Sequence, residues 1–310
     1  MNNLQDVFAY LDTLNNREEL NRRNWEQELY LSYPELSELE KKKKDLMIRR
    51  LKDIMDSPLE KDRIVGESEQ EINSINAKIA DIKQKRGIPE YKEIFVCGKC
   101  HGTGYVGNEL CSCVRRIAYK ELFGAKTADD ISYTYDDFDS SIFEDTDQMT
   151  ASEYLKRNLM MFSSDYPNNR IKNIIFSGAP GLGKTYNMEN LVKMLSEKED
   201  DICFISSYRL FEVFHRDRLG DFDDLKLIYD AKIIAIDDLG SEPITQNVTK
   251  EYFFDFLNYR IDKGLYTFIA TNNDIYQIQE RYSGRVASRL KDDNTCIFIK
   301  MEGKDLRVRS

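Results

Sequence analysis

A glycine-rich loop between an apolar strand and a helix constrains this chain more than any other feature. The stretch IIFSGAPGLGKTYNMENL runs from Ile174 to Leu191, and within it GAPGLGKT fits the pattern G-x-x-x-x-G-K-[ST] at every fixed position. Such glycines let backbone N–H groups curl around a phosphate, and the helix that follows points its N-terminus at the anion. The sequence therefore predicts a nucleotide-phosphate site in an α/β domain.

The chemistry of the loop residues predicts individual roles. Lys184 is expected to reach the β- and γ-phosphate oxygens, and the Thr185 hydroxyl is expected to bind Mg²⁺. The remaining loop residues and the next helical residue are predicted to contact the nucleotide: Gly178, Ala179, Pro180, Gly181, Leu182, Gly183 and Tyr186.

Two further apolar strands end in polar residues that such a site can use. KIIAIDDLG contains Asp237, which would hold Mg²⁺, and Asp238, which could orient or deprotonate the attacking water. Aspartate is one methylene shorter than the glutamate common at such sites, so a nucleotide switch with little hydrolysis stays an alternative. YTFIATNN offers Asn272 as a hydrogen-bond donor to the γ-phosphate or the water, with Asn273 as the alternative.

A segment near the C-terminal end offers two arginines. In SGRVASRLKDD, Arg285 and Arg289 are four residues apart and share one face of a predicted helix. A guanidinium that meets the charge developing on a transferred phosphoryl group accelerates hydrolysis, and a neighbouring subunit can supply it. The plainer interpretation is a pair of surface arginines near Asp292 and Asp293.

Four of the six cysteines lie within seventeen residues, in CGKCHGTGYVGNELCSC. Their spacings, C-x2-C and C-x-C, predict a closed tetrahedral zinc site made by Cys97, Cys100, Cys111 and Cys113. His101 is the alternative ligand. Because this module is too small to have much of a hydrophobic core, zinc would supply much of its folding energy. The module either only stabilises the connection between domains or is a docking surface for protein or single-stranded nucleic acid.

Periodicity and composition divide the chain into four parts. The N-terminal part combines dense charge with isoleucines at helical spacing, which predicts a helical domain with a helical hairpin; the isoleucines are Ile72, Ile75, Ile79 and Ile82. In the C-terminal part five strand-like runs alternate with helical ones, which predicts a parallel sheet with helices on both faces. The predicted parts are a helical N-terminal domain (1–90), a zinc-binding module (91–119), a polar and aromatic linker (120–150) and an ATPase domain (151–310).

Composition excludes some classes of protein. The 310 residues contain no run of about 18 apolar residues, and MNNLQDVFAYLDTL lacks the features of a signal peptide, so we expect a cytoplasmic protein that does not contact membranes. The net charge of −10 argues against a general nucleic-acid coat, although a local basic groove is compatible with it. The run EKKKKDLMIRRLK is either a solvated helix face or a basic contact surface for DNA or an acidic partner.

The motifs, in this order and spacing, resemble those of the AAA+ ATPases. More narrowly, GAPGLGKTY, IIAIDDLG, FIATNN and GRVASRL resemble the DnaC/DnaI-type bacterial helicase loaders, a group that includes the transposase helper IstB. The resemblance covers about residues 135–310. A helical domain and a CxxC…CxC module before the ATPase are similar to loaders of the Firmicutes type, whereas IstB-like helpers usually lack that module.

The resemblance implies roles for single residues. It assigns Walker A to Lys184 and Thr185, Walker B to Asp237 and Asp238, sensor 1 to Asn272, the arginine finger to Arg289 with Arg285 as the alternative, and sensor 2 to Arg307. It also implies an AAA+ P-loop ATPase core with a central parallel sheet and without a C-terminal helical lid.

The resemblance further implies a function. The chain would use ATP, Mg²⁺ and Zn²⁺ and would load a hexameric, DnaB-type replicative helicase onto single-stranded DNA. The helical domain and zinc module would grip the helicase, and the ATPase domain would self-associate. A helper ATPase of transposition or phage replication and an ATP-gated adaptor with little hydrolysis are the alternatives.

Overall fold

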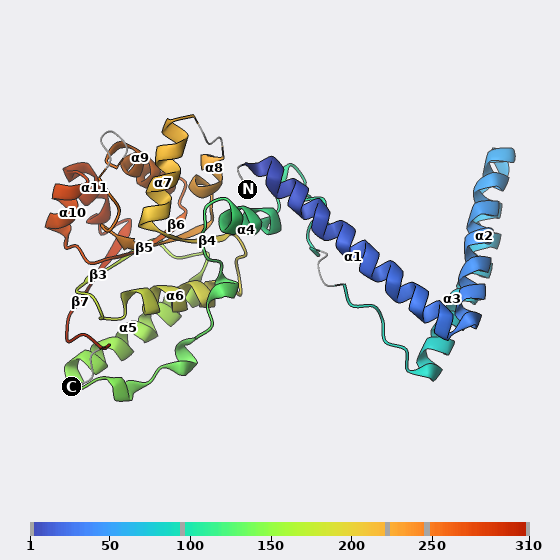
Figure 1. Ribbon diagram of the computed structural model, residues 1–310, viewed down its shortest axis with the longest axis horizontal. Helices are drawn as coiled ribbons and strands as arrows, with labels where there is room; N and C mark the ends of the chain where they lie inside the picture. Colours follow the sequence, from blue (N-terminus) through green and yellow to red (C-terminus); the bar gives the residue numbers. More distant parts are fainter. Residues whose placement is uncertain (1–2, 94–96, 221–223, 245–248, 308–310) are drawn as a thin grey trace. The chain divides into compact units, whose positions relative to one another are not determined.

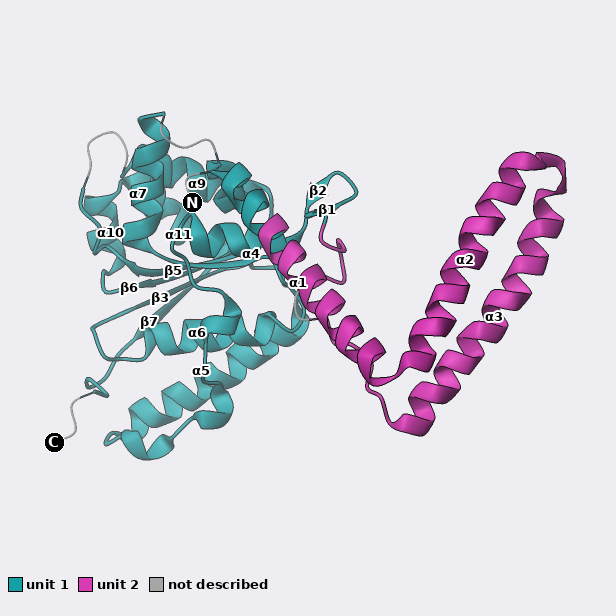
Figure 2. Ribbon diagram, turned by 45° about the vertical axis from the view of Figure 1, so that its right-hand side comes forward, with its two compact units in different colours: residues 1–11, 103–310 teal, residues 12–102 magenta. Residues whose placement is uncertain are grey.

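The computed structural model describes residues 3–93, 97–220, 224–244 and 249–307. The chain divides into two compact units (Figure 2). Unit 1 comprises residues 1–11 and 103–310, and unit 2 comprises residues 12–102. The predicted domain boundaries remain a prediction. Among the described residues, no helix has the length and apolarity that a bilayer crossing requires.

Unit 2 consists mainly of long helices. They are α1 (Leu4–Ser32), whose first residues count with unit 1, α2 (Pro34–Asp56), the short η1 (Pro58–Glu60) and α3 (Lys61–Arg86). α2 and α3 lie side by side as a hairpin (Figure 2). α2 begins at Pro34, where a missing N–H costs nothing, and α3 ends at Gly87, whose left-handed φ of 64° caps the helix. The predicted hairpin is confirmed.

A small apolar core holds unit 2 together. Leu29, Leu36 and Ile79 are buried in it, and Ile75 and Ile82 pack against it. The predicted isoleucine stripe is therefore the packing face of α3. A second apolar stripe, on α2, is exposed instead: Met47, Leu51 and Met55.

Unit 1 is built around a five-stranded parallel sheet with the order β4-β5-β6-β3-β7. The strands are β3 (Asn173–Gly178), β4 (Ile202–Ser206), β5 (Ile233–Leu239), β6 (Tyr266–Thr271) and β7 (Cys296–Met301). These are the five apolar runs that the sequence predicted. A separate antiparallel pair joins β1 (Tyr105–Val106) and β2 (Glu109–Leu110).

Helices cover both faces of the large sheet, as predicted, with α5 and α6 on one side and α7, α9 and α11 on the other (Figure 1). The helices of unit 1 are α4 (Ser112–Glu121), α5 (Thr146–Asp165), α6 (Lys184–Leu195), α7 (Ser207–Arg218), α8 (Leu225–Tyr229), α9 (Glu251–Asp262), α10 (Ile275–Arg281) and α11 (Gly284–Leu290). Alternate strand residues such as Phe176 and Phe268 pack on Met188 and Val192 of α6 in one buried cluster. The predicted α/β fold class, a central parallel sheet covered by helices, is confirmed.

The stretch predicted as a linker (120–150) contains short elements up to residue 145, whereas its last residues already belong to the long helix α5, which begins at Thr146. The short elements are the 3₁₀ helices η2 (Ala128–Asp130), η3 (Tyr135–Asp137) and η4 (Ser140–Ile142). Before them, Lys126 forms two backbone hydrogen bonds with Phe204 at the edge of β4, of 2.7 and 3.1 Å. This part of the chain is therefore packed onto the sheet.

Arg260 is the largest fully buried side chain of unit 1 among the described residues. Its guanidinium donates to the Thr267 hydroxyl at 3.0 Å and to backbone carbonyls, including those of Ala231 at 2.8 Å and Tyr266 at 2.6 Å. Burial lowers the pKa of Arg260 to about 10. The guanidinium thus satisfies carbonyls beside the amino ends of β5 and β6, where water does not reach.

Replacing Arg260 with methionine is expected to destabilise the protein by about 3 kcal/mol, because buried carbonyls would lose their donors. Urea unfolding followed by circular dichroism measures the change. Arg157→Met is the matched control, since Arg157 is exposed on α5, and it should shift the unfolding free energy by about 0.5 kcal/mol or less. Equal effects of the two substitutions would contradict the role assigned to Arg260.

Candidate nucleotide site and thiol cluster

The predicted phosphate loop connects β3 to α6 at the carboxyl edge of the sheet. Gly181 and Gly183 have φ values of 80° and 82°, a region that glycine reaches without strain. Gly178 must stay without a side chain for another reason: an added Cβ would lie 2.4 Å from the backbone oxygen of Met301 in β7. The loop is thus shaped by its glycines and held by the neighbouring strand.

A cavity of about 690 Å³ lies against this loop. Its lining includes the residues from Pro180 to Tyr186, together with Asp237, Asp238, Asn272 and Arg307. Gly178 and Ala179, although predicted as contacts, are not among the described residues that line it. The structure therefore brings most of the predicted nucleotide-site residues to one place.

Lys184 is the first residue of α6 and is largely buried. Its ammonium donates to the backbone oxygen of Ala179 at 2.7 Å, so the side chain is folded along the loop. Burial lowers the pKa of Lys184, whereas the charges of Asp238 and Asp237 act in the opposite direction. A phosphate in the loop would give this cation an anionic partner in place of a neutral carbonyl.

Thr185 and Asp237 meet across two elements. The Thr185 hydroxyl donates to Asp237 Oδ1 at 2.9 Å. Burial raises the pKa of the Asp237 carboxyl above its ordinary value, and the hydrogen bond from Thr185 opposes that shift. A hydroxyl and a carboxylate are hard oxygen donors of the kind that Mg²⁺ prefers, so this pair fits the predicted magnesium site.

Asp238 has an unusual backbone conformation, with a φ of 54°. Its carboxylate Oδ1 accepts from Asn272 Nδ2 at 3.0 Å, and its backbone oxygen accepts from the Ser207 hydroxyl at 2.8 Å. Its own N–H donates to Asp237 Oδ1 at 3.0 Å. Thr185, Asp237, Asp238 and Asn272 therefore form one hydrogen-bonded chain beside the loop.

Of the two adjacent asparagines, Asn272 belongs to this chain and lines the cavity. Asn273 instead lies against Gly240, where an added Cβ would be 2.1 Å from Asn273 Nδ2.

The fold places the three predicted arginines at different sites. Arg307 lines the cavity, where it pairs with Asp305 through bonds of 3.0 and 2.7 Å. Arg285 and Arg289 are exposed on α11, and neither is among the described residues lining the cavity. Arg289 donates to Asn258 Oδ1 at 2.6 Å, and the Arg285 guanidinium lies 5.1 Å from the Phe254 ring centroid.

One wall of the cavity was not predicted. It comes from the stretch assigned to the linker and includes Asp137, Phe138, Asp139, Ile142 and Phe143. The signal in the sequence was three apolar residues within the otherwise polar DDFDSSIF. The rings of Phe138 and Phe143 are 5.9 Å apart, so this wall offers an apolar surface next to the phosphate loop.

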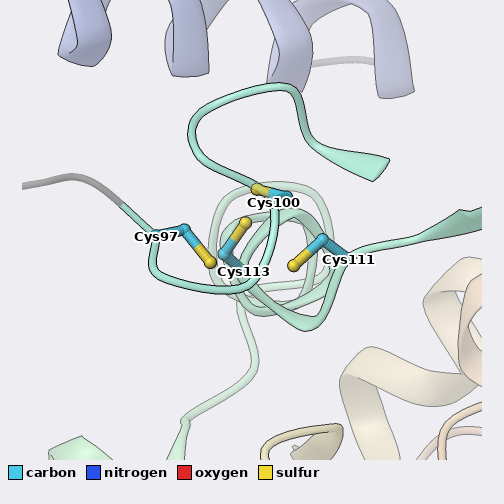
Figure 3. A group of neighbouring side chains, drawn as sticks. All are labelled: Cys97, Cys100, Cys111 and Cys113. Carbon is cyan, nitrogen blue, oxygen red and sulfur yellow. The ribbon is translucent and has the colours of Figure 1, made fainter. Parts of the chain in front are cut away.

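The four predicted zinc ligands come together (Figure 3). All ligand atoms lie within 4.8 Å of one another, and three of the thiols are buried; the ligands are Cys97, Cys100, Cys111 and Cys113. Zinc with four thiolates at about 2.3 Å gives sulfur–sulfur separations of about 3.8 Å, so the cluster fits that ion with little adjustment. His101, the alternative ligand, is exposed and is not a member of the group.

α4 begins at this cluster, with Cys111 as its N-cap and Cys113 in its first turn. Further along the helix, Val114 and Tyr119 are buried, and the Tyr119 hydroxyl donates to Asp201 Oδ1 at 2.6 Å. The helix that carries two of the ligands is therefore packed against the five-stranded sheet.

Cys113→Ser is expected to abolish stoichiometric zinc binding and to destabilise the protein by about 3 kcal/mol or more, because a closed thiolate site contributes folding energy. Metal analysis of the purified protein and thermal unfolding measure the two effects, and a strong chelator should reproduce the second. Cys296→Ser is the control, since Cys296 is buried outside the cluster. Normal zinc content in the Cys113 variant would exclude the predicted ligand set.

No family model and no curated protein matches the chain. Several solved structures do. A structure of DnaI is 21% identical with a TM-score of 0.41, and the match covers 61% of this chain and 93% of that one. A structure of the DnaC helicase loader is 22% identical with a TM-score of 0.42, covering 51% of this chain and 93% of that one.

Domain III of the replication initiation protein DnaA from Thermotoga maritima is 18% identical with a TM-score of 0.44, covering 55% of this chain and 69% of that one. At identities this low, the likeness concerns the fold alone.

Proposed function

We propose that this protein is an ATP-dependent loader of a hexameric, DnaB-type replicative helicase onto single-stranded DNA during replication initiation. The observation that carries the ATPase part is the hydrogen-bonded chain from Thr185 to Asn272 beside the phosphate loop. The loading part is supported by the resemblance of the motifs and by a thiol cluster and helical hairpin that precede the ATPase core.

The geometry of the site supports a separate role for each residue in ATP hydrolysis. The loop N–H groups and Lys184 would hold the β- and γ-phosphates, and Thr185 with Asp237 would hold the metal, which when bound neutralises developing phosphate charge. Asp238 would orient or deprotonate the attacking water. Its bond from Asn272 fixes the direction of the carboxylate, and both residues would act on the γ-phosphate and the attacking water.

Arg285 and Arg289 support a requirement for self-association. Both are exposed on α11 and lie outside the cavity of their own chain. A guanidinium offered to the nucleotide of a neighbouring copy would add charge stabilisation to that of Lys184 and Arg307, which line the cavity of their own chain. Turnover should therefore be slow until copies assemble.

The predicted parts of the chain would have separate partners. The helical domain (1–90) with the zinc module (91–119) would bind the helicase, and the ATPase domain (151–310) would bind its neighbours and single-stranded DNA. The exposed apolar stripe of α2, with Leu51 at 61% and Met55 at 79% exposure, is a surface that a protein partner can cover. Binding energy would drive opening or assembly of the ring, and hydrolysis would release the loader.

A nucleotide-gated adaptor with little hydrolysis is the second candidate. The observation that favours it is the engagement of Asp238 Oδ1 by Asn272, because that bond competes with contact to a water. In that case ATP would act as a conformational ligand, and its cleavage would be incidental.

Asp238→Asn separates the two candidates. Asparagine tolerates the left-handed backbone region, so the turn should survive. Loss of a general base should lower ATP turnover by about 100-fold or more with little change in ATP affinity. Steady-state phosphate release and binding of a fluorescent ATP analogue measure these, with Asp293→Asn, an exposed site, as the control. Unchanged turnover would favour the adaptor.

Binding to the replicative helicase of the same organism tests the loader proposal itself. The full-length protein is expected to bind it in at least one nucleotide condition, by analytical ultracentrifugation or calorimetry. The full-length variant Leu51→Glu/Met55→Glu should bind about 100-fold more weakly, a loss of about 2.7 kcal/mol. Because both side chains are exposed, folding and ATP binding should not change.

A fragment of residues 91–310 is the second test. It keeps the four cysteines of the predicted zinc site and α4. It should bind ATP but not the helicase. Failure of the full-length protein to bind in any nucleotide state would reject the loader proposal. Full binding by the fragment would reject the assignment of the helical domain.

A further inference from the structure

Glu242 is a buried carboxylate that the proposed hydrolysis does not use. Its side chain has 0% exposure, and it is not among the described residues that line the nucleotide cavity. A carboxylate is costly to bury unless donors surround it. The donors around Glu242 belong to two different parts of the ATPase core.

The first part is the turn that follows β5. Glu242 Oε2 accepts from the backbone N–H of Gly240 at 2.9 Å. Gly240 is two residues from Asp238, and the turn is closed by a bond of 3.1 Å from the N–H of Ser241 to the oxygen of Asp238. An added Cβ on Gly240 would lie 2.1 Å from Asn273 Nδ2, so this turn packs closely against the asparagine pair after β6.

The second part is the corner between α10 and α11. Glu242 Oε1 accepts from Arg281 Nε at 3.1 Å and from the Tyr282 hydroxyl, and the Glu242 backbone oxygen accepts from Arg281 Nη2. Tyr282 has 0% exposure, and its ring packs 5.1 Å from the ring of Phe253. The corner is therefore fixed by Glu242 and by an aromatic core.

α11 starts directly after this corner. The Ser283 hydroxyl accepts from the N–H of Val286 at 3.3 Å and caps the helix. α11 spans seven residues and carries Arg285 and Arg289. A displacement of the corner would thus move both arginines together.

We infer that Glu242 is a positioning residue that couples the turn carrying Asp238 to the helix carrying Arg285 and Arg289. The inference rests on the proposed function, in which those arginines serve the nucleotide of a neighbouring copy. The nucleotide state of one copy would then set the position of the arginine that the copy offers to the next. The two carboxylate oxygens of a single side chain form the connection.

The chemistry of the connection requires a carboxylate. Within the described part of the chain, Gly240 N–H, Arg281 and Tyr282 all act as donors toward its two oxygens. An amide at this position has one acceptor oxygen and one NH₂ group, which would face a backbone N–H or a guanidinium. Glutamine therefore keeps the volume but breaks one side of the link.

The test uses the full-length protein and four substitutions. Glu242→Gln breaks the link, and Arg285→Ala and Arg289→Ala each remove one arginine. Asp201→Asn is the matched control, because Asp201 is also a buried carboxylate, bonded to Tyr119 and paired with Arg115 at 3.7 Å, at the amino ends of the strands. We would measure three quantities for each variant: the kcat for ATP hydrolysis across protein concentrations, the affinity for a fluorescent ATP analogue, and the melting temperature.

Glu242→Gln is expected to lower kcat about tenfold, the effect of one lost hydrogen bond, with ATP affinity changed about twofold or less. In a double variant with whichever arginine substitution lowers kcat, Glu242→Gln should reduce kcat by a further factor of about two or less. The two substitutions would then act on the same step, so their effects on kcat would not multiply. Asp201→Asn should lower the melting temperature and leave kcat unchanged.

Three results overturn the coupling: unchanged kcat in Glu242→Gln, multiplicative loss in the double variant, or an equal loss of kcat in Asp201→Asn. If neither arginine substitution changes kcat, both the coupling and the trans-acting arginine are wrong. Helicase binding, measured on the same samples, decides separately whether the loader proposal stands.

Discussion

The position of β6 between β3 and β5 is the constraint on which the site depends. Because all three strands run parallel, their carboxyl ends meet at one edge of the sheet. The phosphate loop follows β3, Asp237 and Asp238 lie in the last three residues of β5, and Asn272 follows β6. The chain of hydrogen bonds from Thr185 to Asn272 is a direct result of that strand order.

Short, local sequence patterns predict much of this structure. Five runs of apolar residues became the five strands, since a strand buried on both faces is apolar throughout. Pro34 and Gly87 stand at helix ends because of backbone chemistry that does not depend on context. The cysteine spacing was equally local, and the four thiols gather as it indicated.

What the sequence did not reveal depends on residues distant in the chain. Phe138 and Phe143 form a wall of the cavity because the stretch before α5 passes the phosphate loop, which no short pattern predicts. The role of Glu242 depends on Arg281 and Tyr282, some forty residues later. Arg285 and Arg289 were correctly placed together on a helix, but their distance from the cavity follows from the packing of α11.

The backbone of Asp238 also bears on why this position holds an aspartate. A φ of 54° is tolerated best by glycine, asparagine and aspartate, whose short side chains bond locally. A longer glutamate would be strained there, so the shorter acid is the residue that suits the turn rather than a weakened form of a glutamate. The backbone conformation therefore determines which acid suits this position, and the Asp238 carboxylate that it presents accepts a hydrogen bond from Asn272 Nδ2.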